Sequence, residues 1–171
     1  ETLLDERVCD CCPTSALAFE DGRFLIAYRD RSHDEVRDIA LVRGSVRDPR
    51  PWTSGIRVHA DGWRIAGCPV NGPRLARHGE NVALAWFTAA DERARVQLAF
   101  SLDAGAHFGA PLCIAQEGAL GRVDVVLVDA QRALVTWLEL DGEGARWCAR
   151  LADWSGSLGD VHAVATVTGE R

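Results

Sequence analysis

The feature of this sequence that most limits its fold is a hairpin pattern that occurs three times. Short runs in which apolar and polar residues alternate, typical of strands with one buried face, are paired across turn residues. The paired runs are Ser15–Glu20 with Arg23–Arg29, Pro73–Arg77 with Asn81–Thr88, and Val123–Val128 with Ala133–Glu139. The second runs carry an aromatic residue near their ends, at Tyr28, Trp86 and Trp137, with intervals of 58 and 51 residues. The pattern therefore predicts an all-β fold built from repeated small units.

Each unit has room for two further strands. Third strands are predicted at Asp38–Arg43, Arg95–Ser101 and Ala145–Arg150, and fourth strands at Ile56–His59, Leu112–Ala115 and His162–Val167. A four-stranded antiparallel sheet cannot bury both of its faces alone, so units that repeat at about 50 residues favour the blades of a β-propeller. We place blade one at about 9–60, blade two at about 67–116 and blade three at about 120–168. The alternative is one β-sandwich of twelve short strands.

One turn is predicted in detail. Asp21-Gly22 separates the runs of the first hairpin, and this dipeptide is typical of a tight turn in which both central residues have positive φ.

Composition excludes some classes of partner. The chain has 171 residues, 47% of them hydrophobic, which is enough for one compact domain. The formal net charge is −6 and the sequence contains no basic run, so nucleic acid is not expected as a partner. No apolar stretch reaches the roughly 20 residues of a membrane span, and no signal peptide is visible. Because the chain opens on Glu1 and contains no Met, we expect a fragment or a processed piece.

A local motif lies between the third and fourth strands of blade two. The stretch 101–108 has the pattern Ser/Thr-x-Asp-x-Gly-x-x-Trp/Phe, with Ser101, Asp103, Gly105 and Phe108 at the defining positions. Asp can accept backbone N–H bonds within such a turn, Gly permits positive φ, and the aromatic ring can fill the space between strands. The motif predicts a structural clip.

This pattern is the Asp box of bacterial neuraminidase repeats, and the chain resembles the sialidase superfamily, specifically its exported bacterial sialidase-like proteins, over essentially its whole length. The resemblance implies a six-bladed propeller, of which this chain would hold three blades, and a carbohydrate or other polar ligand in the central funnel. It also implies export to the periplasm or the outside of the cell. Three blades leave open sheet edges, so closure is expected to need a missing N-terminal half or a second copy.

In a propeller, the loops that enter the innermost strands of successive blades converge at the mouth of the funnel. Here these loops are 9–14, 67–72 and 121–124. With neighbouring charges, they give the candidate ligand-binding residues Asp10, Arg37, Asp38, His59, Asn71, Arg122 and Asp124. For the charged residues the alternative is a structural salt bridge or turn hydrogen bond, and for His59 a structural histidine.

The same loops hold four cysteines, Cys9, Cys11, Cys12 and Cys68. One of the first three can form a disulfide with Cys68 that ties blade one to blade two. Alternatively, the thiolates can bind Zn or Cu(I), although adjacent Cys11 and Cys12 do not readily point to one ion. Unpaired or redox-active thiols are the third alternative. Cys113 and Cys148 lie in apolar strand patterns and are expected to be buried free thiols.

The catalytic set that the resemblance implies is incomplete. A sialidase needs an Arg cluster, an acid/base Asp and a Tyr activated by Glu, but the sequence has no Arg-Ile-Pro motif, and Tyr28 matches no family nucleophile position. We therefore assign no catalytic residue and expect glycoside hydrolysis only if the missing blades supply the remaining groups. The alternatives are a non-catalytic cell-envelope propeller with a cysteine-based metal or redox site, and an interaction scaffold.

Overall fold

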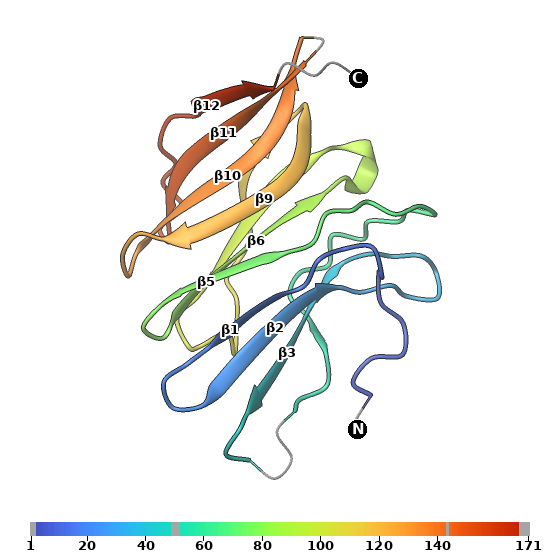
Figure 1. Ribbon diagram of the computed structural model, residues 1–171, viewed down its shortest axis with the longest axis vertical. Helices are drawn as coiled ribbons and strands as arrows, with labels where there is room; N and C mark the ends of the chain where they lie inside the picture. Colours follow the sequence, from blue (N-terminus) through green and yellow to red (C-terminus); the bar gives the residue numbers. More distant parts are fainter. Residues whose placement is uncertain (1–2, 49–51, 143, 168–171) are drawn as a thin grey trace.

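The computed structural model describes residues 3–48, 52–142 and 144–167, which form three four-stranded antiparallel sheets (Figure 1). Sheet one contains β1 (Ser15–Ala18), β2 (Arg23–Arg29), β3 (Ile39–Ser45) and β4 (Ile56–Arg57). Sheet two contains β5 (Arg74–His78), β6 (Asn81–Thr88), β7 (Arg95–Ser101) and β8 (Leu112–Gln116), with a short 3₁₀ turn at Ala90–Glu92. Sheet three contains β9 (Ala119–Leu127), β10 (Arg132–Asp141), β11 (Gly144–Asp153) and β12 (His162–Val167).

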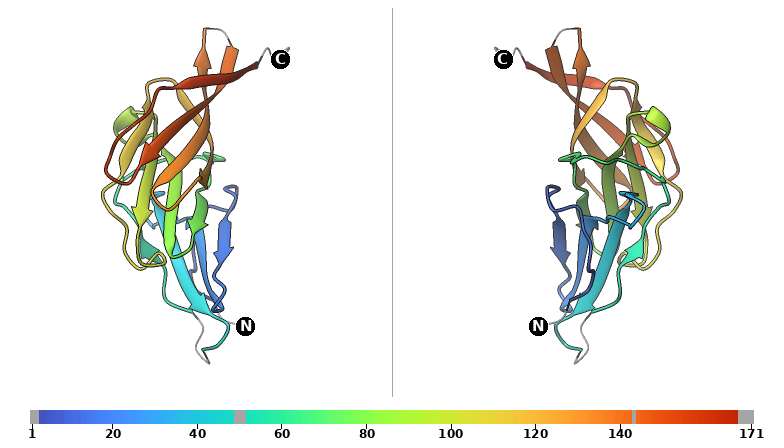
Figure 2. Two further views of the ribbon diagram at one scale, coloured as in Figure 1. Left: turned by 90° about the vertical axis from the view of Figure 1, so that its left-hand side faces the viewer. Right: turned by 90° about the vertical axis from the view of Figure 1, so that its right-hand side faces the viewer.

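Every sheet is a meander in which strands consecutive in sequence are neighbours. The predicted all-β fold with three four-stranded units is confirmed, and the alternative of a single sandwich is wrong because the strands separate into three sheets. Figure 2 shows the sheets stacked face to face. Residue 168, the predicted end of blade three, lies outside the described residues. No helix in the described part of the chain is long and apolar enough to cross a bilayer.

The recurring aromatic residues mark how the sheets pack. Trp86 points from sheet two into the core shared with sheet one, beside Leu25 and Leu41. Trp137 points from sheet three into the core shared with sheet two, and both tryptophan side chains are fully buried. Tyr28 holds the corresponding place on sheet one, on the face away from sheet two. The number of residues between successive aromatic residues is therefore the length of chain that leads from one packed sheet to the next.

The innermost strand of sheet three is longer than its pattern predicts. The stretch 121–124, expected to be a loop, belongs to β9, and Gly121 and Arg122 have φ of 86° and 55°. The pairing with β10 shifts register between Thr136 and Leu138, opposite these residues. The apparent loop is a β-bulge, which the long partner strand β10 keeps within the sheet.

The first hairpin also differs from its prediction. Gly22 has positive φ, but Asp21 does not. The Phe19 amide donates to the Arg23 carbonyl, and the Gly22 amide donates to the Phe19 carbonyl. This is a three-residue loop whose last residue, Gly22, has the left-handed backbone conformation. Asp21 does not share that conformation, and its carboxylate accepts a hydrogen bond from the Arg23 amide.

The turn 101–108 forms a clip at the end of sheet two. The Asp103 carboxylate accepts the Ser101 hydroxyl at 2.8 Å and the His107 amide at 2.9 Å, and the Ser101 hydroxyl accepts the Gly105 amide at 2.9 Å. Hydrogen bonds from the His107 side chain and amide hold the pKa of Asp103 well below its usual range. Phe108 packs against the core between sheets one and two.

Gly105 is where this clip touches the neighbouring sheet. Its φ is +76°, and a Cβ there would lie 2.6 Å from Leu25 Cδ1 of sheet one. Gly79, in the β5–β6 turn, has φ of +61° and open space where its Cβ would be. We predict that Gly105→Ala lowers the free energy of unfolding by about 1–3 kcal/mol more than Gly79→Ala, because it adds overpacking to the same backbone strain. Urea unfolding of both variants checks this, and equal losses would contradict the packing described here.

Candidate functional site

Segments from all three sheets meet at one end of the strands, opposite the Ser101–Phe108 clip. This end, called the funnel rim below, comprises residues 9–14, 30–38, 59–73 and 117–122. The Cys9 amide donates to the Arg29 carbonyl at the end of β2, and the side-chain amide of Asn71 donates to the Leu120 carbonyl of β9. The Leu75 amide of β5 donates to the Ser15 hydroxyl of β1. The expected convergence of inner-strand segments is therefore present in the structure.

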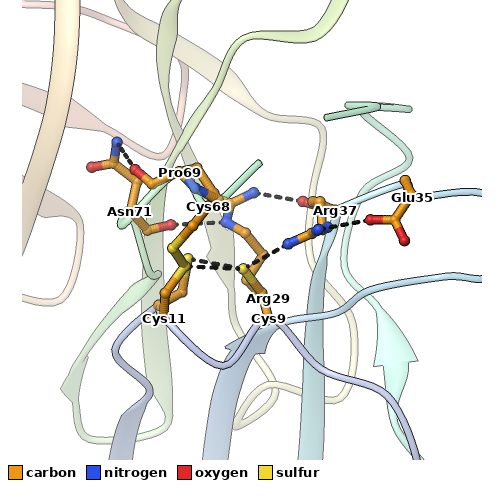
Figure 3. Close-up of a disulfide and its surroundings, with 9 residues drawn as sticks. Cys9, Cys11, Arg29, Glu35, Arg37, Cys68, Pro69 and Asn71 are labelled. Carbon is orange, nitrogen blue, oxygen red and sulfur yellow. Dashed lines mark hydrogen bonds and ion pairs between the residues drawn. A yellow bond between two sulfur atoms is a disulfide. The ribbon is translucent and has the colours of Figure 1, made fainter. Parts of the chain in front are cut away.

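A disulfide joins two of these segments. Cys11 bonds to Cys68 across 57 residues, with the Cα atoms 6.2 Å apart (Figure 3). Cys9 and Cys12 are buried free thiols beside it: Cys9 Sγ lies 3.6 Å from Cys11 Sγ and 3.4 Å from Cys12 Sγ. Burial and the hydrogen bond with Cys9 raise the pKa of Cys12, which favours the neutral thiol. The ligand atoms of Cys9, Cys11 and Cys12 lie within 4.8 Å of one another, so adjacent Cys11 and Cys12 do reach a common point.

The other two cysteines lie away from this cluster. Cys148 is a buried free thiol in β11, as its pattern predicts. Cys113 in β8 is a free thiol but only half-buried, because it lies in the outermost strand of its sheet.

Arg29, at the end of β2 where it meets the rim, has a deeply buried charged side chain, 1% exposed. Its guanidinium donates to three backbone carbonyls: Asn71 at 2.8 Å, Arg37 at 2.5 Å and Phe87 at 2.7 Å. It also lies 4.9 Å from the centroid of the Trp63 ring, within range of a cation–π contact. One cation thus holds together the β2–β3 loop, the long loop before β5 and the end of β6.

Arg37 connects the cysteines to a cluster of surface charge. Its guanidinium is buried and donates to Cys9 Sγ at 3.0 Å and to the Glu35 carboxylate at 2.7 Å. The Glu35 carboxylate also forms ion pairs with Arg31 and Arg7. Hydrogen bonds from Arg31 and Arg37 lower the pKa of Glu35 to about 2. Arg37, which the sequence predicted as a ligand-binding charge of the funnel, is therefore engaged with Cys9 and Glu35 of the protein itself.

Asn71 fastens the loop that follows Cys68. Its side chain donates to the Pro69 carbonyl at 3.1 Å and accepts the Arg122 amide at 2.8 Å. A Cβ on Gly121 would lie 2.2 Å from Asn71 Oδ1, which explains a glycine at the bulge of β9. The amide of Asn71 is engaged in this loop-to-strand contact.

A second polar group lies beside the core between sheets one and two. Asp38, 1% exposed, accepts the Gly62 amide at 2.9 Å and the Trp63 amide at 3.2 Å through one oxygen, and its other oxygen lies 3.6 Å from Arg57 Nε. Burial raises the pKa of Asp38.

His59 belongs to the same group through its partner Asp61. The Nδ1 atom of His59 lies 2.9 Å from Asp61 Oδ1, and the Trp86 indole donates to Asp61 Oδ2 at 2.7 Å. Because these contacts are internal, the arrangement positions the 59–64 loop against sheet two.

Three sequence-predicted residues point outward. Asp10 and Arg122 are exposed, and the side chain of Asp124 is 72% exposed. Asp124 lies 3.9 Å from Arg74 of β5, which joins the two inner strands at the rim. None of these three exposed side chains forms a hydrogen bond or ion pair with Arg37 or Asp38 in the part of the chain that the structure describes.

Tyr28 has a carboxylate partner, but its chemistry differs from that of an activated nucleophile. Its hydroxyl donates to Asp5 Oδ2 at 2.7 Å. Burial and the Asp5 carboxylate raise the pKa of Tyr28 far above its ordinary value. This environment stabilises the neutral phenol rather than the phenolate that a nucleophilic Tyr requires.

Sequence reasoning missed Arg29, Glu35 and Asp61. Arg29 ends an apolar strand pattern, where an ion is unexpected, and Glu35 lies between Arg31 and Arg37 at spacings of four and two residues. Asp61 is two residues from the predicted candidate His59. These local irregularities are the signals that were available in the sequence.

The contacts of Arg29 give a stability prediction. Arg29→Met retains much of the aliphatic stem but leaves three backbone carbonyls, two of them in fully buried contacts, without their donor. We therefore expect a loss of about 3 kcal/mol or more. Arg64→Met, which changes an exposed Arg on the same rim, should change the free energy of unfolding by less than about 0.5 kcal/mol. Chemical denaturation of both variants measures the difference. Similar stabilities would mean that Arg29 does not hold the rim together.

The environment of Glu35 gives a pH dependence. Since the folded pKa is lowered to about 2, the ionised group stabilises the fold above its unfolded value of about 4.3, and this contribution is lost as the pH falls towards 2. Glu35→Gln should therefore lower the melting temperature at pH 7, and its difference from the unmodified protein should shrink below pH 4 and vanish near pH 2. Calorimetric scans across this range test the sign. A difference that is constant with pH would contradict the ion pairs with Arg7, Arg31 and Arg37.

Comparison with known proteins gives the fold. No family model matches the chain, and no curated protein sequence matches it. Among solved structures, it is similar to a Hadza microbial sialidase, with 15% identity and a TM-score of 0.57 over 96% of this chain and 38% of that one. It is also similar to an α-L-arabinofuranosidase of Podospora anserina, with 12% identity and a TM-score of 0.55 over 94% of this chain and 54% of that one.

A third similar structure is the NanB sialidase of Streptococcus pneumoniae, with 13% identity and a TM-score of 0.54 over 84% of this chain and 22% of that one. The chain thus spans between about a fifth and just over half of the length of these three proteins. At such identities the likeness extends to the fold alone. The three sheets are blades of a β-propeller related in architecture to those of carbohydrate-active enzymes.

Proposed function

We propose that this chain is part of a sialidase-like propeller that binds a carbohydrate or another polar ligand at the funnel rim. The observation that carries the proposal is the convergence of the inner-strand segments of three blades, fixed by the Cys11–Cys68 disulfide and by the contacts of Asn71 with β9. In a propeller, this end of the inner strands surrounds the central axis. The similar solved structures include sialidases and an arabinofuranosidase, which supports a sugar as the class of ligand.

The exposed polar side chains of the rim are the groups available to a ligand. Arg122 offers a guanidinium that can hold a carboxylate through two parallel hydrogen bonds. Asp10 and Asp124 offer carboxylates that can accept hydrogen bonds from sugar hydroxyls. Asn71, His59, Arg37 and Asp38, the other sequence-predicted candidates, act in this proposal as the support that fixes the rim.

Hydrolysis by this chain alone is not part of the proposal. Glycosidases need two carboxyl groups placed on either side of the scissile bond. Within the described residues, the buried carboxylates Asp38 and Asp61 are bound to backbone amides and to an indole. Hydrolytic activity would require further blades that supply the remaining carboxylates and Arg residues.

Sheet three leaves an apolar face uncovered. On sheet three, Val126, Trp147 and Leu151 are 50%, 37% and 41% exposed, and Val126 and Leu151 lie opposite the same residue of β10. An apolar sheet face of this kind is covered by the next blade in a propeller. We infer that further blades, from a longer polypeptide or a second copy, complete the ring. The disulfide at the rim favours an exported protein, because disulfides persist in oxidising compartments.

Binding of an acidic sugar provides the test. Titration of the 171-residue chain with 3′-sialyllactose in a calorimeter should show saturable binding that Arg122→Met weakens at least tenfold, since the guanidinium would hold the sugar carboxylate. Arg132→Met, at the opposite end of the strands, should leave the affinity unchanged. An arabino-oligosaccharide tests a neutral sugar in the same way. The absence of binding by both sugars, or equal effects of the two Arg variants, would contradict the proposal.

Catalysis is tested separately with fluorogenic sialoside and arabinofuranoside substrates. We expect no turnover by this chain alone. Turnover of either substrate would overturn the inference that its catalytic set is incomplete.

A further inference from the structure

The four cysteines of the funnel rim form a tighter group than a disulfide requires. A structural link between blades one and two needs only Cys11 and Cys68, yet Cys9 Sγ lies against Cys11 Sγ (Figure 3). Cys12 Sγ in turn lies against Cys9 Sγ. The turn that presents them is closed by a hydrogen bond from the Cys12 amide to the Cys9 carbonyl at 3.2 Å. The sulfurs of Cys9, Cys11 and Cys12 therefore lie within 4.8 Å of one another, and Cys68, from a distant segment, reaches them through its bond to Cys11.

The spacing of the sulfurs is close to that of a tetrahedral thiolate centre. Zn–S bonds of about 2.3 Å in tetrahedral geometry separate neighbouring sulfurs by about 3.8 Å. Cys9 Sγ lies 3.6 Å from Cys11 Sγ and 3.4 Å from Cys12 Sγ. These two separations are near the metal-bound spacing, and Cys11 Sγ and Cys68 Sγ would move apart to reach it once the bond between them is broken.

The surroundings suit a negatively charged centre. Four thiolates around a divalent ion carry a net charge of −2, and two buried guanidinium groups lie next to the sulfurs. Arg37 donates to Cys9 Sγ at 3.0 Å, and Arg29 interacts with Cys9 and Cys12. The backbone amide of Asn71 favours the thiolate form of Cys12. Hydrogen bonds of this kind orient metal-bound ligands and balance their charge.

A route from solvent to the sulfurs is also present. A cavity of about 310 Å³ is lined by Cys9 and Cys12 together with Tyr28, Arg29 and Leu4. It lies on the face of sheet one that points away from sheet two, so it does not cross the packed core. An ion can reach the thiols without opening the interface between blades.

We propose that Cys9, Cys11, Cys12 and Cys68, when reduced, form a tetrathiolate site for one thiophilic divalent ion of the Zn²⁺ type. The disulfide form and the metal form exclude each other, because Cys11 and Cys68 are ligands only as thiolates. A dithiol reductant supplies the two electrons and two protons that convert the Cys11–Cys68 disulfide into two thiols, and is itself oxidised to a disulfide. Metal binding then releases the four thiol protons to solvent.

The test uses the 171-residue chain, reduced with dithiothreitol and desalted without oxygen. Titration with Co²⁺ should give the visible absorption bands of a tetrahedral thiolate complex, saturating at one ion per chain, and Zn²⁺ should remove them. Zn²⁺ should also protect four of the six cysteines from a thiol reagent. The oxidised chain should bind neither ion in this way.

Two variants separate the cluster from the rest of the chain. Cys12→Ser should weaken Co²⁺ binding at least tenfold and shift its absorption bands, while Cys11–Cys68 still forms on oxidation. Cys113→Ser, which changes a free cysteine outside the cluster, should leave both unchanged. If the reduced unmodified chain gives no thiolate bands with Co²⁺, or if Cys12→Ser leaves them unaltered, the proposal is wrong and the four cysteines are structural.

Discussion

The guanidinium of Arg29 is the interaction on which the funnel rim depends. It lies where β2 ends, and its three carbonyl acceptors belong to the β2–β3 loop, the loop before β5 and strand β6. Burying a charge is costly unless the charged group is hydrogen-bonded. With one carbonyl acceptor on each of its three nitrogens, the same charge fixes the position of three segments that have no regular hydrogen bonding between them. The disulfide and the Asn71 contacts complete that arrangement.

The two ends of the blades serve different physical purposes. At the clip end, Asp103 and Gly105 close a turn and press it against Leu25 of the neighbouring sheet. At the funnel rim, irregular segments are held by side chains instead of by sheet pairing, and exposed Arg122 and Asp124 remain available at the inner strands. Rigid sheets with a distinct rim of loops are the common arrangement by which a scaffold carries a binding site.

The strand pattern was largely predictable. Alternation depends on one residue and its near neighbours, so β2, β6, β7 and β12 have the predicted boundaries. The interval between Trp86 and Trp137 also revealed the packing repeat, because each fills the same place against the preceding sheet. The bulge at Gly121 and Arg122 was not predicted, since it is a register shift in the pairing with β10, which lies later in the chain.

The sequence by itself determined the all-β class, the three four-stranded units and the loops that carry the cysteines, because these follow from local alternation, turn residues and repeat spacing. Only the tertiary structure decided that Cys11 is the partner of Cys68, that Arg37 and Asp38 are buried against internal partners, and that Arg29 joins three segments. These facts depend on distances between residues far apart in the chain. Local patterns do not contain such distances, which are set when the sheets pack and the loops close over them.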